Sequence, residues 1–92
     1  MIPIHPGRIL KRELKARSLS ANALSRALRV PSGRVVDILN GKRGISAETA
    51  LRLGRYFGND PQFWLNLQSQ YELAAAMRDI GPLVAREVER AA

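Results

Sequence analysis

Two stretches in the first half of the chain place apolar side chains at the spacing of one helical face. In residues 20–28 these positions recur at i, i+3 and i+4, and they are Ala23, Leu24, Ala27 and Leu28. In residues 32–40 they are Val35, Ile38 and Leu39. The opposite side of the second stretch carries Ser32, Arg34, Val36, Asp37 and Asn40. Each stretch is too short to be a stable helix alone, so the pattern predicts two helices that pack on each other.

The residues between and around these stretches predict a tight turn and two clean helix ends. Pro31 has no N–H and disfavours a helical backbone at Val30. Ser20 precedes the first stretch as an N-cap, and Asn40-Gly41 supplies left-handed residues that end the second. Two short helices with facing apolar stripes and such a turn predict a helix-turn-helix, whose second helix lies in the major groove of DNA.

Two further helices flank this unit. His5-Pro6-Gly7 opens the first, because a proline near the first helical position loses no hydrogen bond there, and it runs to about Arg17. Ser46 caps the other, which ends at Gly58. Both therefore begin and end at ordinary helix signals.

The longest helix is predicted after Asp60-Pro61, a capping acid followed by proline. Nothing interrupts it before Asp79, and Ile80-Gly81-Pro82 is expected to break it. The sequence therefore predicts an all-α protein: one five-helix domain in residues 1–79 and a tail in residues 80–92 that can form a short helix.

This long helix carries more apolar side chains than one buried face requires. A ridge at spacings of three and four is suited to a homodimer contact, and its members are Trp64, Leu67, Tyr71 and Ala74. The alternative is that these side chains pack only into the core of their own chain.

Positive charge is concentrated in the half of the chain that contains the helix-turn-helix. Ten of the 15 Lys and Arg residues lie in residues 1–45, with only two of the eight acidic residues. A positive surface of this kind suits the phosphates of a nucleic acid. A solvated basic surface without a partner would have the same composition.

The remaining composition excludes several classes of function. With no Cys, disulfides and thiolate metal sites are excluded. His5 has no second His or nearby carboxylate to form a metal or acid–base site, so we interpret it as structural. No stretch resembles a signal peptide or a membrane span. We expect a cytoplasmic protein that is not an enzyme and needs no cofactor or metal.

The helix-turn-helix and three further segments together resemble the HigA antitoxins, a branch of the phage-repressor-like helix-turn-helix proteins. The three segments are HPGRIL at 5–10, NGKRGISAETALRLGRYFG at 40–58 and DPQFWLNLQSQYEL at 60–73. The resemblance implies a phage-repressor-like fold and a homodimer that binds operator DNA and represses its own operon. It also implies a partner, a HigB-type toxin, which is a small ribonuclease that the antitoxin neutralises.

The resemblance further implies which residues contact DNA. Positions matching base-reading sites are Ser32, Gly33 and Asp37, with Arg34 adjacent, and positions matching backbone contacts are Asn40, Lys42 and Arg43. The chain departs from its relatives by having Ala21 where Gln is usual and Arg29 where a turn Gly is common. We expect Arg29 to adopt an awkward backbone conformation or the turn to differ.

The chemistry of these side chains refines their roles. Gly33 weakens its helix and has no side chain, which is typical of close approach to a base or sugar. Arg34 can donate two hydrogen bonds to guanine. Asp37 can accept from cytosine, orient Arg34, or be a solvated helix acid, and Ser32 can be a simple first-turn cap.

Two other functions remain open at this point. A ribonuclease would need a paired acid and base, which the sequence does not supply. A helix-turn-helix regulator without a toxin would have the same DNA-binding motif. A toxin-sized open reading frame beside the gene would distinguish it from an antitoxin.

Overall fold

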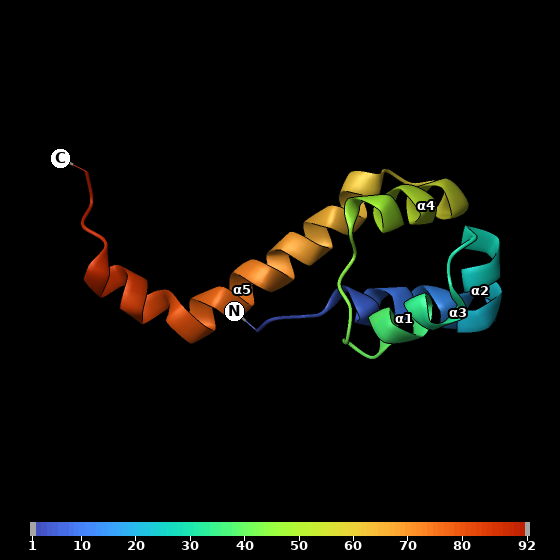
Figure 1. Ribbon diagram of the computed structural model, residues 1–92, viewed down its shortest axis with the longest axis horizontal. Coiled ribbons are helices and arrows are strands. Elements are labelled where there is room, and N and C mark those ends of the chain that lie inside the picture. Colours follow the sequence, from blue (N-terminus) through green and yellow to red (C-terminus); the bar gives the residue numbers. More distant parts are fainter. Residues whose placement is uncertain (1, 92) are drawn as a thin grey trace.

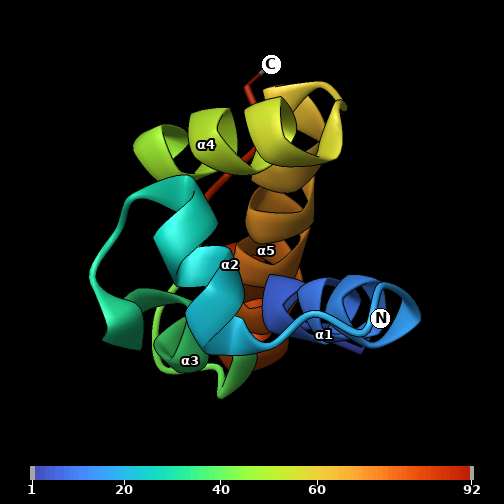
Figure 2. The same ribbon diagram turned by 90° about the vertical axis from the view of Figure 1, so that its right-hand side faces the viewer.

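Five α-helices form the computed structural model, which describes residues 2–91 (Figure 1). They are α1 (Pro6–Ala16), α2 (Ala21–Leu28), α3 (Ser32–Leu39), α4 (Ala47–Phe57) and α5 (Pro61–Glu87). No residue from 2 to 91 lies in a strand, so the all-α prediction is confirmed. Viewed along the long axis, α1 to α4 surround one end of α5 (Figure 2). The other end of α5 projects away, and the molecule measures 52 × 22 × 22 Å.

Side-chain caps explain where the helices begin. Ser20 Oγ, Ser46 Oγ and Asp60 Oδ1 accept hydrogen bonds from backbone N–H groups two or three residues further on, at 2.9 to 3.2 Å. His5 does the same for α1, because its Nδ1 accepts from the Gly7 N–H at 2.9 Å. The predicted helix starts are confirmed, and His5 has the structural role expected of it.

The turn between α2 and α3 is formed by a strained non-glycine residue. Arg29 adopts a left-handed backbone conformation with φ 60°, as expected where relatives have glycine. Behind the turn, the small Ser25 is buried and donates from its Oγ to the Ser32 carbonyl oxygen at 3.3 Å. The two helices of the predicted helix-turn-helix are therefore present and cross closely.

All five helices contribute to one core. Its buried members are Leu10, Leu14, Leu24, Leu28, Val35, Ile38, Ile45, Ala50, Leu53 and Trp64. Gly7 allows α1 to approach the end of α3, because a Cβ at that position would collide with the Ile38 carbonyl oxygen. The position of α3 is thus determined by direct contact with α1.

The predicted helix break at Ile80-Gly81-Pro82 is wrong. Helix α5 continues through Pro82 to Glu87, and its axis bends in the second half (Figure 1). Proline normally clashes with the Cβ of the preceding residue, but Gly81 has none. The carbonyl of Arg78 that Pro82 leaves unpaired belongs to an exposed turn. The segment predicted as a separate tail therefore begins inside a continuous helix.

Trp64 is also placed differently from the prediction. Its side chain is only 1% exposed, its Nε1 donates to Asn59 Oδ1 at 3.1 Å, and its ring lies 5.7 Å from that of Phe57. Trp64 belongs to the core of its own chain, so its assignment to a dimer interface is corrected. Ala74 is only 2% exposed, so its assignment to a dimer interface is corrected as well. Leu67 and Tyr71 are half-buried and line a groove of 230 Å³ together with Ile2, Ile4, Ile9, Gln70 and Ala74.

Candidate nucleic-acid interface

The outer side of α3 is free of packing within the chain. Ser32, Gly33, Val36 and Asn40 are exposed and Asp37 is half-buried, whereas Val35 and Ile38 point into the core. A Cβ on Gly33 would meet no atom within 4 Å. The absence of a side chain at Gly33 is therefore not required by the fold, and a ligand could approach the backbone there.

Val36 is a candidate contact that the sequence analysis did not single out. It is an apolar side chain, 37% exposed, on the same side of α3 as Asp37 and Asn40. Apolar side chains in the major groove contact the methyl group of thymine. The sequence signal for Val36 is its position on the side of the helix opposite the apolar stripe of Val35, Ile38 and Leu39.

Arg34 does not lie free on this outer side, because it is paired with α4. Its Nη1 donates to Glu48 Oε1 at 3.1 Å, and its side chain is 21% exposed. Within residues 2–91 Asp37 forms no ion pair with Arg34. Glu48 therefore has the orienting role that the sequence analysis considered for Asp37.

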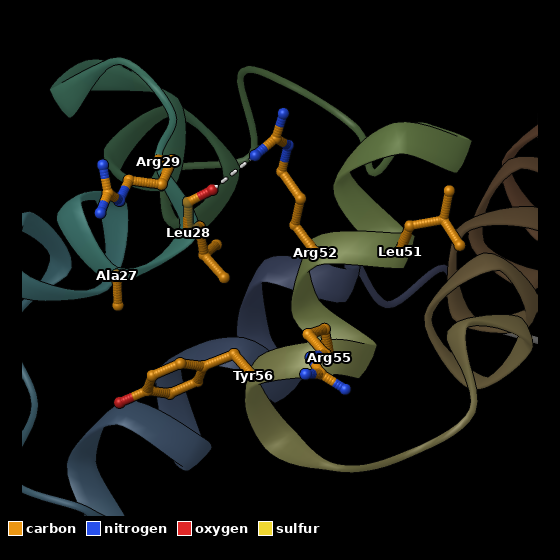
Figure 3. Close-up of a pocket in the computed structure, with 7 residues that line it drawn as sticks. All are labelled: Ala27, Leu28, Arg29, Leu51, Arg52, Arg55 and Tyr56. Atoms are coloured by element: carbon orange, nitrogen blue, oxygen red, sulfur yellow. Dashed lines mark hydrogen bonds between the residues drawn. The ribbon is translucent and has the colours of Figure 1, made fainter.

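The same carboxylate connects α3 to α2 through a second arginine. Glu48 Oε2 lies 3.6 Å from Arg52 Nη2, and Arg52 Nη1 donates to the Leu28 carbonyl oxygen at 2.8 Å (Figure 3). Arg52 thus satisfies an otherwise unpaired carbonyl at the end of α2. This set of contacts holds the helix-turn-helix against α4.

The loop after α3 presents two cations on a constrained backbone. Gly41 has φ 74°, whereas Asn40 has φ −87°, so only one of the two predicted left-handed residues is left-handed. The Asp37 carbonyl oxygen accepts from the N–H groups of Lys42 at 2.8 Å and Arg43 at 3.2 Å. Both cationic side chains are exposed beside the end of α3, as contacts to a duplex backbone require.

His5 connects this loop to α1 and α5. Its ring packs edge-on against Tyr71 with the centroids 4.9 Å apart. Burial lowers the pKa of His5 from its ordinary value of 6.5, and a hydrogen bond with the backbone of Arg43 partly opposes the shift. The neutral imidazole is the form that can accept from Gly7, so the fold favours it.

Two clefts add positive charge near the helix-turn-helix. One, of 360 Å³, is lined by Arg8, Lys11, Arg12, Lys15 and Leu39. The other, of 380 Å³, lies between α2 and α4 and has Arg29, Arg52 and Arg55 around an apolar floor (Figure 3). These cations extend the basic surface beyond the loop.

Residues 2–91 contain no cluster of three or more His, Cys, Asp or Glu side chains that could hold a metal ion. None of the five helices in that range is long and apolar enough to cross a bilayer.

The fold and the free outer side of α3 define a helix-turn-helix protein. A family model described as helix-turn-helix matches residues 10–64. The chain belongs to this family and, within it, to the HigA antitoxins, since it is 35% identical over 72 residues to antitoxin HigA-1 of Vibrio cholerae, covering 77% of this chain and 68% of that one. It is also 54% identical over 80 residues to virulence-associated protein I of Dichelobacter nodosus, covering 86% and 74% of the two chains.

Solved structures agree with this assignment. A HigA-family addiction module antidote protein from Coxiella burnetii superimposes with a TM-score of 0.96 at 48% identity, covering 99% of this chain and all of that one. Antitoxin HigA of Pseudomonas aeruginosa, solved with the higBA promoter, gives 0.95 at 49% identity over the same shares. The predicted family and fold are confirmed, and the contact residues stay predictions.

Proposed function

We propose that this protein is an antitoxin and transcriptional repressor that binds its operator as a dimer and neutralises a HigB-type toxin. The observation that carries the DNA-binding part is the outer side of α3, which has no packing partner and lies beside the loop of Lys42 and Arg43. The relatives support it, since antitoxin GraA, 42% identical to this chain, was solved in complex with its operator.

The arrangement supports two groups of contact residues, one that reads the bases and one that binds the DNA backbone. The base-reading group comprises Ser32, Gly33, Arg34, Val36 and Asp37, all on α3. Asn40, Lys42 and Arg43 follow that helix and would contact the backbone of the duplex. The negative charge of DNA would be met by the cations of α1 and the α2–α4 cleft.

The dimer contact is best supported by the projecting half of α5. The exposed large apolar side chains of this half and of Val88, the residue after it, are Leu73, Met77, Ile80, Leu83, Val84 and Val88. Four of them, Leu73, Met77, Ile80 and Val84, line a groove of 400 Å³ that also includes Ala76, Gly81 and Ala85, whose small size permits close helix approach. A contiguous apolar surface on a helix without neighbours is typical of an association site. A second copy can bury this surface on both chains.

A catalytic role has less support. Nδ1 of His5, the single histidine, already accepts a hydrogen bond from Gly7, and the acidic side chains that pair with arginines are exposed. A general base needs a free acceptor near a substrate site. We infer that the protein acts by binding.

Footprinting on the DNA upstream of the gene tests the repressor role. Two symmetric half-sites about one helical turn apart, roughly 34 Å, are expected for a dimer. Protection of a single asymmetric site by a monomer would contradict the proposal.

Co-expression with the product of the adjacent small open reading frame tests the antitoxin role. A stable complex that abolishes its ribonuclease activity is expected. A gene neighbourhood without such a reading frame would favour the toxin-free regulator instead.

A further inference from the structure

A side chain of α5 holds the backbone of the loop that follows α3. Gln68 Oε1 accepts from the Ile45 N–H at 2.8 Å, across 23 positions of sequence. Ile45 is anchored next to it, since its side chain is 3% exposed in the core. This hydrogen bond joins the end of the DNA-facing loop to the first third of the longest helix.

The loop is shaped to fit this side chain. A Cβ on Gly44 would lie 2.7 Å from Gln68 Nε2 and 2.8 Å from Oε1, so the Gln68 amide occupies the space beside Gly44. The Nε2 group donates to Glu72 Oε1 at 2.9 Å, which fixes the orientation of the amide. Gln68 is therefore fixed on one side by α5 and on the other by the loop.

A second contact lies one turn further along α5. Tyr71 packs against His5, whose Nδ1 accepts from the Gly7 N–H at the start of α1. Gln68 and Tyr71 are three residues apart and share one face of the helix. The loop carrying Lys42 and Arg43 is thus attached to α5 directly at Gln68, and the next turn of α5 contacts the start of α1 through Tyr71 and His5.

The apolar surface of α5 begins directly beyond these turns, at Leu73. If a second copy covers that surface, each DNA-facing loop is tied to the dimer contact through less than two turns of helix. The separation between the two loops is then set by α5, because the loops cannot shift independently along the duplex.

We propose that Gln68 is a positioning residue that sets the spacing of half-sites the dimer accepts. This inference rests on the proposed function, namely a dimer on an operator. Each added base pair moves a half-site by about 3.4 Å and rotates it by about one tenth of a turn. Helix α3 stays fixed in the core in either case, but the backbone contacts of Lys42 and Arg43 can follow the change once the loop is released from Gln68.

The test compares affinities for the native operator and for operators whose spacer is one base pair longer or shorter. For the unaltered protein, a changed spacer should lower the affinity about tenfold, the scale of one mismatched base pair. This loss of affinity is the spacer penalty. Gln68→Met removes the acceptor while keeping side-chain length. It should weaken native binding and reduce the spacer penalty to about twofold.

Three further variants separate positioning from general damage. Gln68→Glu combined with Glu72→Gln keeps an oxygen for the Ile45 N–H and exchanges donor and acceptor in the contact between the two side chains, so it should retain the spacer penalty. Gly44→Ala displaces the Gln68 amide from the loop side and should reduce the penalty even if Gln68→Met fails to fold. Gln62→Met is the matched control, since Gln62 is exposed on α5 and its amide contacts Asn66; it should behave as the unaltered protein.

An unchanged spacer penalty in Gln68→Met and Gly44→Ala, with the dimer intact, would overturn the inference and leave the proposed function standing. Failure of the unaltered protein to bind the native operator would instead reject the proposed function.

Discussion

Arg34 of α3 and Glu48 of α4 form an ion pair in which the guanidinium Nη1 lies 3.1 Å from the carboxylate. The pair joins the helix proposed to read DNA to the helix behind it, across 14 positions of sequence. Nε of Arg34 is buried without a hydrogen-bond partner. In the proposed complex a guanine base would compete with Glu48 for the same guanidinium, and the pair would set the direction from which Arg34 approaches DNA.

Removing Arg34 tests its reading role. Arg34→Ala should cost about 1–3 kcal/mol in operator binding and relax the preference at one base pair. Competition binding against operator and random duplex measures both effects. Equal losses on the two duplexes would show that Arg34 serves only to hold Glu48 and α4 in place.

Val36 should contribute a preference for thymine at one position. Val36→Ala shortens an exposed apolar side chain and should reduce that preference, at a cost of about 1 kcal/mol or less, below that of a full mismatch. Operator selection from a randomised library would reveal the position. If Val36→Ala and the unaltered protein select the same sequence, Val36 lies outside the groove.

The loop cations should supply affinity without sequence preference. Lys42→Ala or Arg43→Ala should weaken all duplexes similarly and lower the slope of log affinity against log salt by about one unit each. Titrations at several salt concentrations measure the slope. Neither variant should change thermal stability, because both side chains are exposed; a large loss of stability would indicate a structural role.

A charge on the projecting half of α5 should separate the dimer. Met77 is 54% exposed in the single chain, so Met77→Glu leaves the core intact but would bury an unpaired charge between two copies. Light scattering should show a folded monomer that has lost operator affinity. Ser69→Glu, on an exposed polar position of the same helix, should remain dimeric. A dimeric Met77→Glu protein would move the interface elsewhere.

Acid should destabilise the protein through His5. The folded state has a His5 pKa below 6.5, whereas the unfolded state titrates near 6.5. The unfolded state therefore takes up the proton first, and the free energy of unfolding falls as pH drops below 6.5 toward the folded pKa.

The control for this effect is His5→Asn. Asparagine keeps an oxygen that can cap α1 but does not titrate near neutral pH. Thermal melts at pH 7.5 and 5.5 should show a smaller decrease for His5→Asn than for the unaltered protein. Equal decreases would assign the acid sensitivity to other groups.

The parts of this fold that were predictable are those with local causes. Ser20, Ser46 and Asp60 identify helix starts because a cap acts on N–H groups two or three residues away. Pro31 and Gly58 mark helix ends for equally local reasons. The helix-turn-helix was accessible from sequence because its two apolar stripes are adjacent in the chain.

The contacts that position the interface could not be predicted in this way. Arg34 pairs with Glu48 and Gln68 with Ile45 across long sequence separations, and several exposed acids and amides could equally have been partners. Trp64 shows the same limitation, since an aromatic residue on an amphipathic ridge suits a core or an interface until its neighbours are known. A helix break at Pro82 does not occur because the preceding residue is Gly81, which has no Cβ to clash with the proline ring.

The close approach of α1 to α3 at Gly7 has a consequence for how attraction and recognition are coupled. Helix α1 carries Arg8, Lys11, Arg12 and Lys15, which together line a cleft with Leu39 of α3. Because Gly7 has no Cβ, α1 and α3 are in direct contact there. The cationic surface proposed to attract any duplex and the helix proposed to read the bases therefore move as one rigid unit. A protein bound to non-specific DNA through this surface would already hold α3 at the major groove. Searching along the duplex would then require no separate reorientation of α3.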